Sequence, residues 1–318
     1  MGRLGGVSRP FSTPVFTVRQ AATGMKVGFD AILLGALSGR AFAAERDRRW
    51  RVLDVGCGSG IVGLLQLQAA DAAGARAWLT SIDIDADAAQ QARSNAASSP
   101  WPASITVLQS SLQEFAAHGH PSFDLVVCNP PYYPRPAESV QARLRHQRAT
   151  QAGIQHENQL PVAADAPDFA QRDASLPLWS ASRGHARFSE YLPAAELVAG
   201  VAALLTRKGR FWCIYPNTVE PLVQREAAAS GLVCTKRVEV VFKRGAIVRR
   251  VVLEFVPNEA AMDRGTPSSE AAGLYPEEQT VVVREDDTHY TDEFIALAQQ
   301  YYAVNLAALP SVVTTDHP

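Results

Sequence analysis

The sequence predicts an α/β fold: a doubly wound, mostly parallel, seven-stranded sheet with a C-terminal antiparallel hairpin. The chain has 318 residues, of which 47% are hydrophobic and 19% charged, as in folded globular proteins. From residue 51, short apolar runs alternate with amphipathic stretches, a pattern typical of parallel strands joined by crossover helices. Two later apolar runs flank a short turn at Arg244-Gly245, which predicts the hairpin.

Local patterns predict each element in turn. Apolar runs rich in β-branched residues indicate strands, and the amphipathic stretches between them indicate helices. Asp85 begins one helix with an acidic first turn, and Gly231 closes another. The expected strands are Arg51–Val55, Trp78–Ile82, Ile105–Leu108, Phe123–Cys128, Arg210–Tyr215, Val238–Phe242 and Val248–Val256. The expected helices are Gly60–Ala73, Asp85–Ser98, Leu192–Leu205 and Val219–Ser230.

We expect one main domain with additions. Residues 1–50 are predicted to be an N-terminal extension that closes a ligand pocket, residues 51–303 the main domain, and residues 304–318 a tail. Residues 138–187 and 257–278 break the alternating pattern and are expected to be long surface loops, mostly disordered. For the first of these loops, a lid over the substrate is the alternative.

Charge and hydropathy narrow the class of protein. No apolar run approaches the roughly 18 residues of a membrane helix, and the basic start lacks the apolar core of a signal peptide. We therefore expect a cytoplasmic protein without a membrane partner. The net charge is −2, but the charges are unevenly distributed. Residues 1–50 contain eight basic and three acidic residues, and residues 236–250 contain six basic and one acidic residue. Residues 257–293 contain ten acidic and two basic residues. This asymmetry fits a basic face for a polyanion and equally an ordinary mixed surface.

The four cysteines are expected to be reduced and buried. Cys57, Cys128, Cys213 and Cys234 show no CxxC spacing, and each lies in or beside an apolar stretch. This pattern favours core cysteines over a disulfide or a metal site. No metal is expected.

A glycine-rich turn, Leu-Asp-Val-Gly-Cys-Gly-Ser-Gly, follows the first expected strand. Gly56, Gly58 and Gly60 allow the backbone to turn sharply and approach a ligand closely, although nucleotide oxidoreductases share this feature. Asp54 at the strand end suits a positively charged amino-acid group and would repel a phosphate. Asp83 at the end of the second strand suits two ribose hydroxyls. Together they predict S-adenosylmethionine (SAM) binding, the alternative being a glycine turn with a capping Asp.

A second motif, Asn-Pro-Pro-Tyr, follows the fourth expected strand and predicts methyl transfer to a planar amino or amide nitrogen. The exocyclic amino nitrogen of adenine is a poor nucleophile because its lone pair is delocalised into the ring. Acceptors for its two hydrogens aim that lone pair at the methyl group. The side-chain oxygen of Asn129 and the backbone carbonyl of Pro130 suit this role, and Pro131 stiffens the backbone. Tyr132 offers a ring for stacking, and a plain turn is the alternative interpretation.

The glycine-rich turn, the Asn-Pro-Pro-Tyr motif and an N-terminal block together resemble those of the bacterial tRNA1(Val) adenosine-37 N6-methyltransferases. The block MKVGFDAILLGA at residues 25–36 is similar to the N-terminal block of that family. The similarity extends over most of residues 15–135, 186–256 and 279–303. The resemblance implies a Rossmann-like, SAM-dependent methyltransferase domain in 51–303, SAM as cofactor, and as substrate an adenine of a tRNA anticodon loop.

Four further residues are singled out by this resemblance. Lys26 and Asp30 lie four apart, so on one helical turn they would close the cofactor pocket or form a surface ion pair. Phe29 stands where the family has Thr. Ser111 replaces the acidic residue that would contact the adenine amino group of the cofactor, which leaves a weaker, uncharged hydrogen bond. These departures keep the cofactor and reaction type and leave the exact RNA open.

Other functions stay open. N5 methylation of a glutamine in a release factor presents the same amide geometry, but those enzymes usually carry a helical domain ahead of the glycine turn, and only 53 residues precede Asp54. Methylation of DNA adenine or of an rRNA amino group uses related motifs. A SAM- or RNA-binding scaffold is the non-enzymatic alternative, although it would have no use for Asn129 and its prolines. We expect a monomer with tRNA as its partner.

Overall fold

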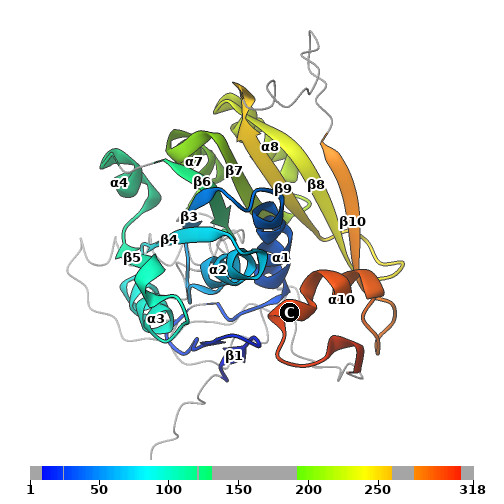
Figure 1. Ribbon diagram of the computed structural model, residues 1–318. Coiled ribbons are helices and arrows are strands. Elements are labelled where there is room, and N and C mark those ends of the chain that lie inside the picture. Colours follow the sequence, from blue (N-terminus) through cyan, green and yellow to red (C-terminus); the bar gives the residue numbers. More distant parts are fainter. Residues whose placement is uncertain (1–8, 24, 120–121, 131–191, 260–275, 309–318) are drawn as a thin grey trace, which may run out of the picture.

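The computed structural model describes residues 9–23, 25–119, 122–130, 192–259 and 276–308 (Figure 1). In these ranges an eight-stranded sheet lies between two helical layers, and a two-stranded sheet lies apart from it. The predicted α/β class is confirmed, as is the C-terminal antiparallel hairpin. The predicted count of seven strands was one too few, because the chain returns after the hairpin and adds a further strand in parallel at the sheet edge.

The strand order of the large sheet is β10-β8-β9-β7-β6-β3-β4-β5, and only β9 runs antiparallel to its neighbours. The first strand of the hairpin and the fifth parallel strand are longer than predicted, the second strand of the hairpin begins two residues later and ends one residue later than predicted, and β10 begins within the last two residues of the second predicted loop. The strands are β3 (Arg49–Val55), β4 (Arg76–Asp83), β5 (Ile105–Gln109), β6 (Phe123–Cys128), β7 (Leu205–Pro216), β8 (Leu232–Lys243), β9 (Arg250–Pro257) and β10 (Glu277–Arg284). The small sheet pairs β1 (Phe11–Ser12) with β2 (Thr17–Val18).

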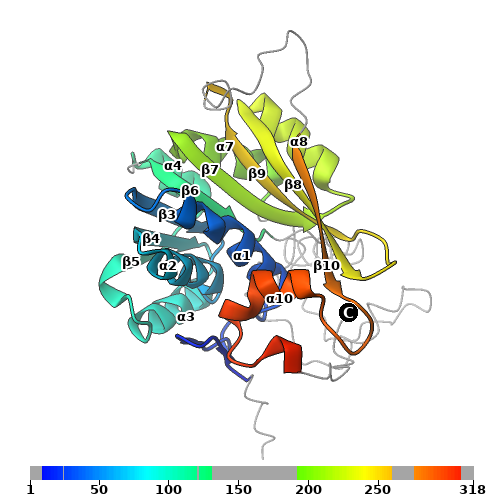
Figure 2. The same cartoon turned by 45° about the vertical axis from the view of Figure 1, so that its right-hand side comes forward.

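Two helical layers cover the sheet (Figure 2). One core cluster joins α1, α2 and α10 to one face, and a second joins α4, α7 and α8 to the opposite face. The α-helices are α1 (Phe29–Ala44), α2 (Ile61–Ala73), α3 (Ala86–Ala97), α4 (Leu112–Ala117), α7 (Ala194–Leu204), α8 (Glu220–Ala229) and α10 (Asp292–Ala298). Short 3-10 turns are η1 (Pro102–Ser104), η3 (Gln299–Tyr301) and η4 (Leu306–Ala308).

The order of the strands creates a switch point between β3 and β6. From β3 the chain moves outward through β4 to β5, then returns to place β6 on the other side of β3. Val55, the last residue of β3, is in register with Cys128, the last residue of β6. In open α/β sheets, ligands bind at such a reversal, beyond the carboxyl ends of the strands. The fold therefore brings the glycine turn and Asn129 to the same place.

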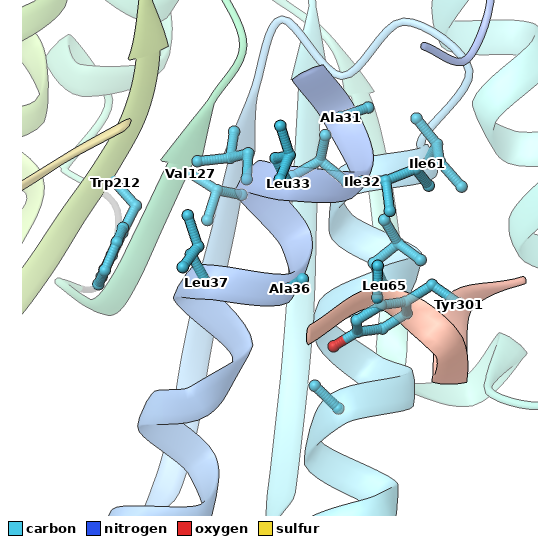
Figure 3. Packing of buried hydrophobic residues seen from close by; sticks show 14 of the residues in the cluster. Ala31, Ile32, Leu33, Ala36, Leu37, Ile61, Leu65, Val127, Trp212 and Tyr301 are labelled. Carbon is cyan, nitrogen blue, oxygen red and sulfur yellow. The ribbon is translucent and has the colours of Figure 1, made fainter. Parts of the chain in front are cut away.

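Helix α1 packs unusually close to α2, because small residues lie between them. A Cβ atom added to Gly35 would lie 2.9 Å from Leu65 Cβ, and one added to Gly39 would lie 2.7 Å from Ala69 Cβ. Figure 3 shows Leu65 beside Ala36 and Tyr301 in this contact. The close approach places the start of α1 beside the switch point. Residues that were predicted to be an extension are thus part of the central core.

The start of α1 is also held from its other side. Phe29, which departs from the family pattern, packs against Phe242 of β8 and Phe294 of α10, with ring centroids 6.2 and 5.9 Å apart. The ring of Tyr290 lies 5.3 Å from that of Phe294 and completes the group. An aromatic side chain at position 29 therefore joins the hairpin and the C-terminal helix to the N-terminal helix.

Within the described ranges, every helix is too short or too polar to cross a bilayer.

Replacing Gly35 with Ala is expected to lower the free energy of unfolding by roughly 1–2 kcal/mol, because overpacking outweighs the gain in helix propensity. Urea denaturation measures this change. Leu65→Ala alone should cost about 2–5 kcal/mol by leaving a cavity. Since the new methyl group enters that cavity, the double variant should lose less than the sum of the two single changes. Strict additivity would contradict the close α1–α2 contact.

Candidate functional site

A cavity opens at the carboxyl ends of the parallel strands, beside the switch point. Its wall comes from the segment before α1, the glycine turn, the ends of β4, β5 and β6, and the start of α7. Of the predicted site residues, it brings together Lys26, Gly56, Gly58, Asp83, Ser111 and Asn129.

The glycine turn presents bare backbone to this cavity. Gly56 and Gly58 have φ values of 66° and 55°, which only glycine adopts without strain. A Cβ atom on either residue would meet no atom within 4 Å, so the space beside them is open to a ligand. The amide of Cys57 donates to the carbonyl of Ile82 at 3.0 Å, which ties the turn to β4.

Asp83 lies where β4 ends, and the backbone fixes its carboxylate. Its Oδ2 accepts a hydrogen bond from the Gly58 amide at 2.8 Å, and its Oδ1 accepts one from the Asp85 amide at 2.9 Å. Asp85 in turn caps α3 by accepting from the Ala88 amide. Because both oxygens are oriented before a ligand arrives, Asp83 can receive hydroxyl donors without first losing side-chain entropy.

Asp54 lies beneath the cavity instead of on its wall. Its side chain is 1% exposed, and its Oδ2 accepts a hydrogen bond from the Gly63 amide at 2.9 Å in the first turn of α2. Burial, and secondarily the nearby charge of Asp83, raise the pKa of Asp54 to about 7, although the Gly63 bond opposes this. Gly60 begins α2 with φ 80° and is likewise absent from the cavity wall. Asp54 and Gly60 therefore support the glycine turn and the first turn of α2 from behind the cavity wall.

Asn129 follows the last residue of β6 and contributes to the cavity wall. Its Oδ1 atom is buried and accepts no hydrogen bond from any described residue. Buried polar oxygens are rarely left without a partner, so the atom is poised for a donor that comes with a ligand. Pro130 follows and is buried. Pro131 and Tyr132 lie outside the described residues, as do residues 138–187.

The segment before α1 differs from the prediction in one respect. The helix begins only at Phe29, because Gly28 is extended, so Lys26 and Asp30 do not share a helical turn. Lys26 reaches the cavity wall together with Met25 and Val27. Asp30 does not, and its Oδ2 accepts a hydrogen bond from Arg250 Nε of β9 at 3.0 Å. Asp30 thus contacts strand β9 of the hairpin and does not line the cavity.

Ser111 lies on the cavity wall and begins α4. Its hydroxyl accepts a hydrogen bond from the Glu114 amide at 3.2 Å, while Glu114 Oε2 accepts one from the Ser111 amide, which makes a capping box. The hydroxyl therefore has a structural role as well.

Sequence reasoning missed several residues of the cavity wall. All of them lie at or next to the end of a helix or strand: Ile84, Asp85, Ser110, Leu112, Gln113 and Leu192.

The cysteines agree with the prediction in the described part of the chain. Cys57, Cys128 and Cys213 are buried thiols, Cys234 is half-buried, and burial raises the pKa of each. Such thiols are poor nucleophiles. The same ranges contain no group of three or more His, Cys, Asp or Glu side chains arranged to hold a metal ion.

Comparison with known proteins agrees with this architecture. Residues 31–158 match the family described as the methyltransferase small domain. The chain is 29% identical over 306 residues to tRNA1(Val) (adenine(37)-N6)-methyltransferase of Salmonella typhimurium strain LT2, covering 95% of this chain and 99% of the relative. The protein of the same description from Salmonella paratyphi B is 29% identical over 294 residues, covering 92% of this chain and 94% of the relative.

A solved structure shares the fold. The protein Atu636 of Agrobacterium tumefaciens, described as a predicted O-methyltransferase, superposes with a TM-score of 0.50 at 16% identity, over 87% of this chain and 98% of that one. The chain is a SAM-dependent methyltransferase. The cavity of this methyltransferase fits its cofactor, because open space lies beside two glycines and the carboxylate of Asp83 is already oriented.

Asp54→Asn should stabilise the methyltransferase increasingly as pH rises. Burial favours the neutral form of the Asp54 carboxyl, whose pKa is about 7 in the folded protein. Its contribution to folding stability is full below about pH 4, where the carboxyl is protonated in both the folded and the unfolded chain. This contribution is lost as the pH rises from about 4 to 7, because the unfolded chain ionises first. Asn is neutral throughout and keeps an oxygen for the Gly63 amide. The gain should be only about 1 kcal/mol at pH 4.5 and reach up to about 4 kcal/mol at pH 8.

Thermal or urea unfolding across this pH range measures the difference. Asp87→Asn, on the exposed first turn of α3, is the control and should show no such trend. Parallel pH profiles for Asp54→Asn and the parent would show that Asp54 is ionised in the folded protein.

Proposed function

We propose that this methyltransferase transfers the methyl group to an exocyclic amino nitrogen, N6 of an adenine in a tRNA anticodon loop. The observation that carries the proposal is the buried Oδ1 atom of Asn129, which has no hydrogen-bond partner among the described residues and lies on the wall of the cavity. An amino group brings the donor that this oxygen lacks. A hydroxyl substrate would bring only one hydrogen and would gain nothing from a second acceptor.

The chemistry follows from the position of this acceptor. When bound, SAM supplies an electrophilic methyl group on a sulfonium. Asn129 Oδ1 accepts one hydrogen of the amino group, and the carbonyl of Pro130 accepts the second. The two bonds favour tetrahedral nitrogen and direct its lone pair toward the methyl carbon. The nitrogen–carbon bond forms as the carbon–sulfur bond breaks, and the acidified nitrogen releases its proton to solvent. Alignment of two reactants accounts for roughly 7–11 kcal/mol of such a barrier.

We assign the cofactor end of the cavity to Gly56, Gly58 and Asp83. The first two let a ligand approach the backbone, and the carboxylate of Asp83 suits ribose hydroxyls. Lys26 lies on the same wall and suits the cofactor's carboxylate. Asp54 acts from beneath, by fixing the first turn of α2. Residues 51–303 would form the catalytic domain, with 1–50 closing its cofactor side.

The choice of tRNA draws on the relatives. Those in Salmonella are described as tRNA1(Val) (adenine(37)-N6)-methyltransferases, and the chain spans nearly their whole length. A loop base is also easier to extract than a paired one, which costs a few kcal/mol to flip from a duplex. We therefore propose an anticodon-loop adenine of valine tRNA as the target, and a cytoplasmic monomer as the active form.

Asn129→Ala should lower kcat by roughly 10²–10³-fold and leave SAM affinity nearly unchanged, because it removes one preorganised partner of the transition state. Asp83→Ala should do the opposite and weaken SAM binding by about 1.5–3 kcal/mol, the usual scale for hydrogen bonds to a charged group. Calorimetry and single-turnover kinetics separate the two effects. Asn217→Ala, an exposed amide after the neighbouring strand β7, is the control. Parent-like turnover of Asn129→Ala would rule out the acceptor mechanism.

The substrate is tested by incubating purified enzyme and labelled SAM with unmodified tRNA transcripts and, separately, with a release factor. The proposal expects label on valine tRNA as N6-methyladenosine, with an affinity that falls steeply as salt rises, because phosphate contacts release counterions. tRNA from a strain lacking the gene serves as a second substrate, since it carries the other natural modifications.

Label on the release factor and none on either tRNA would overturn the RNA proposal in favour of glutamine methylation, which presents the same planar amide to Asn129. In that case the reaction would proceed without RNA and depend weakly on salt. Label on guanine or on DNA would instead keep the amino-nitrogen chemistry and change the substrate.

A further inference from the structure

The tip of the β8–β9 hairpin stands at the same edge of the sheet as the cavity. Strand β8 runs parallel to β10, and β9 runs antiparallel to β7, so β8 ends and β9 begins beyond the carboxyl ends of the parallel strands. Only β7 separates β9 from β6, whose end carries Asn129. Two strand spacings put the base of the hairpin roughly 10 Å from that residue. Figure 2 shows the tip as the yellow loop near the end of β10.

The tip is anchored at its base. The amide of Asn217, just after β7, donates to the carbonyl of Arg249 at 3.3 Å, and Ala246 donates to the carbonyl of Lys243 at 2.9 Å. Gly245 has φ 80°, which allows the tight turn. Arg250 is held by Asp30 of α1. The tip is thus placed by the sheet and by the helix that begins beside the cavity.

Most basic side chains of the hairpin end are already paired. Lys243 lies 2.9 Å from Asp287, Arg244 Nη2 donates to Glu285 at 2.8 Å, and Arg250 lies 3.0 Å from Asp30. Arg249 differs: its side chain is exposed and forms no ion pair with the described residues. A guanidinium left without a carboxylate can bind a phosphate without first breaking a salt bridge.

An apolar side chain lies two residues before it. Ile247 is 70% exposed, the most exposed large hydrophobic residue in the described ranges. Proteins that kink nucleic acids or extract nucleotides use such apolar side chains to contact unstacked bases. Ile247 and Arg249 therefore offer one apolar and one cationic contact at the edge of the sheet where the cavity opens.

We propose that the hairpin tip, through Ile247 and Arg249, binds the RNA strand next to the nucleotide whose base enters the cavity. Arg249 contacts a neighbouring phosphate, and Ile247 packs against a neighbouring base left unstacked by the extraction. The proposal rests on the proposed tRNA substrate and adds how that RNA is held. A nucleotide step spans several ångströms, so a strand with its base at Asn129 passes within reach of the tip.

The test compares Arg249→Gln and Ile247→Ser with Arg76→Gln, using the full chain and an unmodified valine tRNA transcript. Arg76 is a matched control because it is exposed, has no ion pair among the described residues, and begins β4 at the opposite edge of the sheet. Thermal midpoints should be unchanged for all three variants, since each replaced side chain is exposed.

Arg249→Gln should raise KM for tRNA on the order of tenfold at low salt and reduce the slope of log KM against log salt by about 0.7–0.9, the share of one phosphate contact. Ile247→Ser should raise KM without altering this slope. SAM affinity and kcat at saturating tRNA should stay at parental values, and Arg76→Gln should match the parent throughout.

The possible failures are distinguishable. A parent enzyme that labels no RNA overturns the proposed function, and the hairpin contact with it. If the parent enzyme is active but Arg249→Gln and Ile247→Ser behave like the control Arg76→Gln, only the hairpin contact is overturned. A loss of kcat or of SAM affinity in either hairpin variant would also contradict the proposal, because it would assign the tip to cavity geometry instead of RNA binding.

Discussion

The structure depends on one adjacency, the pairing of β3 with β6 at the reversal of strand order. Because Val55 and Cys128 are partners in the ladder, the turn after β3 and the motif after β6 begin roughly 4.8 Å apart, one strand spacing. The backbone hydrogen bonds of a buried sheet hold this distance more firmly than any surface contact could. Methyl transfer needs the donor and the acceptor nitrogen in line, and here the sheet itself sets their separation.

The same place concentrates negative charge. Asp54 and Asp83 lie on adjacent strands, and the charge of Asp83 contributes, after burial, to the raised pKa of Asp54. The Gly58 and Gly63 amides offset part of this cost. A cationic ligand would offset more, and SAM carries a sulfonium and an ammonium. The electrostatics of the cavity therefore favour a positively charged ligand, in contrast to the phosphate sites of other glycine turns.

Much of the fold and part of the site followed from the sequence, because both depend on local patterns. Strand ends and glycine turns are readable one segment at a time, and parallel strands place their ends together, so Gly58, Asp83 and Asn129 were predicted to converge. Features that depend on partners far along the chain could not be predicted in this way. Asp30 pairs with Arg250, 220 residues away, and Asp54 faces α2 rather than the cavity. No periodicity reveals which way a carboxylate at a strand end points.

The N-terminal helix links these features. Its small residues bring it against α2, Phe29 ties it to β8 and α10, and Asp30 ties it to β9. Four residues of the segment before it lie on the cavity wall: Thr23, Met25, Lys26 and Val27. A displacement of the hairpin would therefore pull on the wall of the cofactor cavity through a 3.0 Å ion pair. If RNA binds at the hairpin tip, the contact that recognises the substrate is joined through one buried helix to the contact that holds the cofactor.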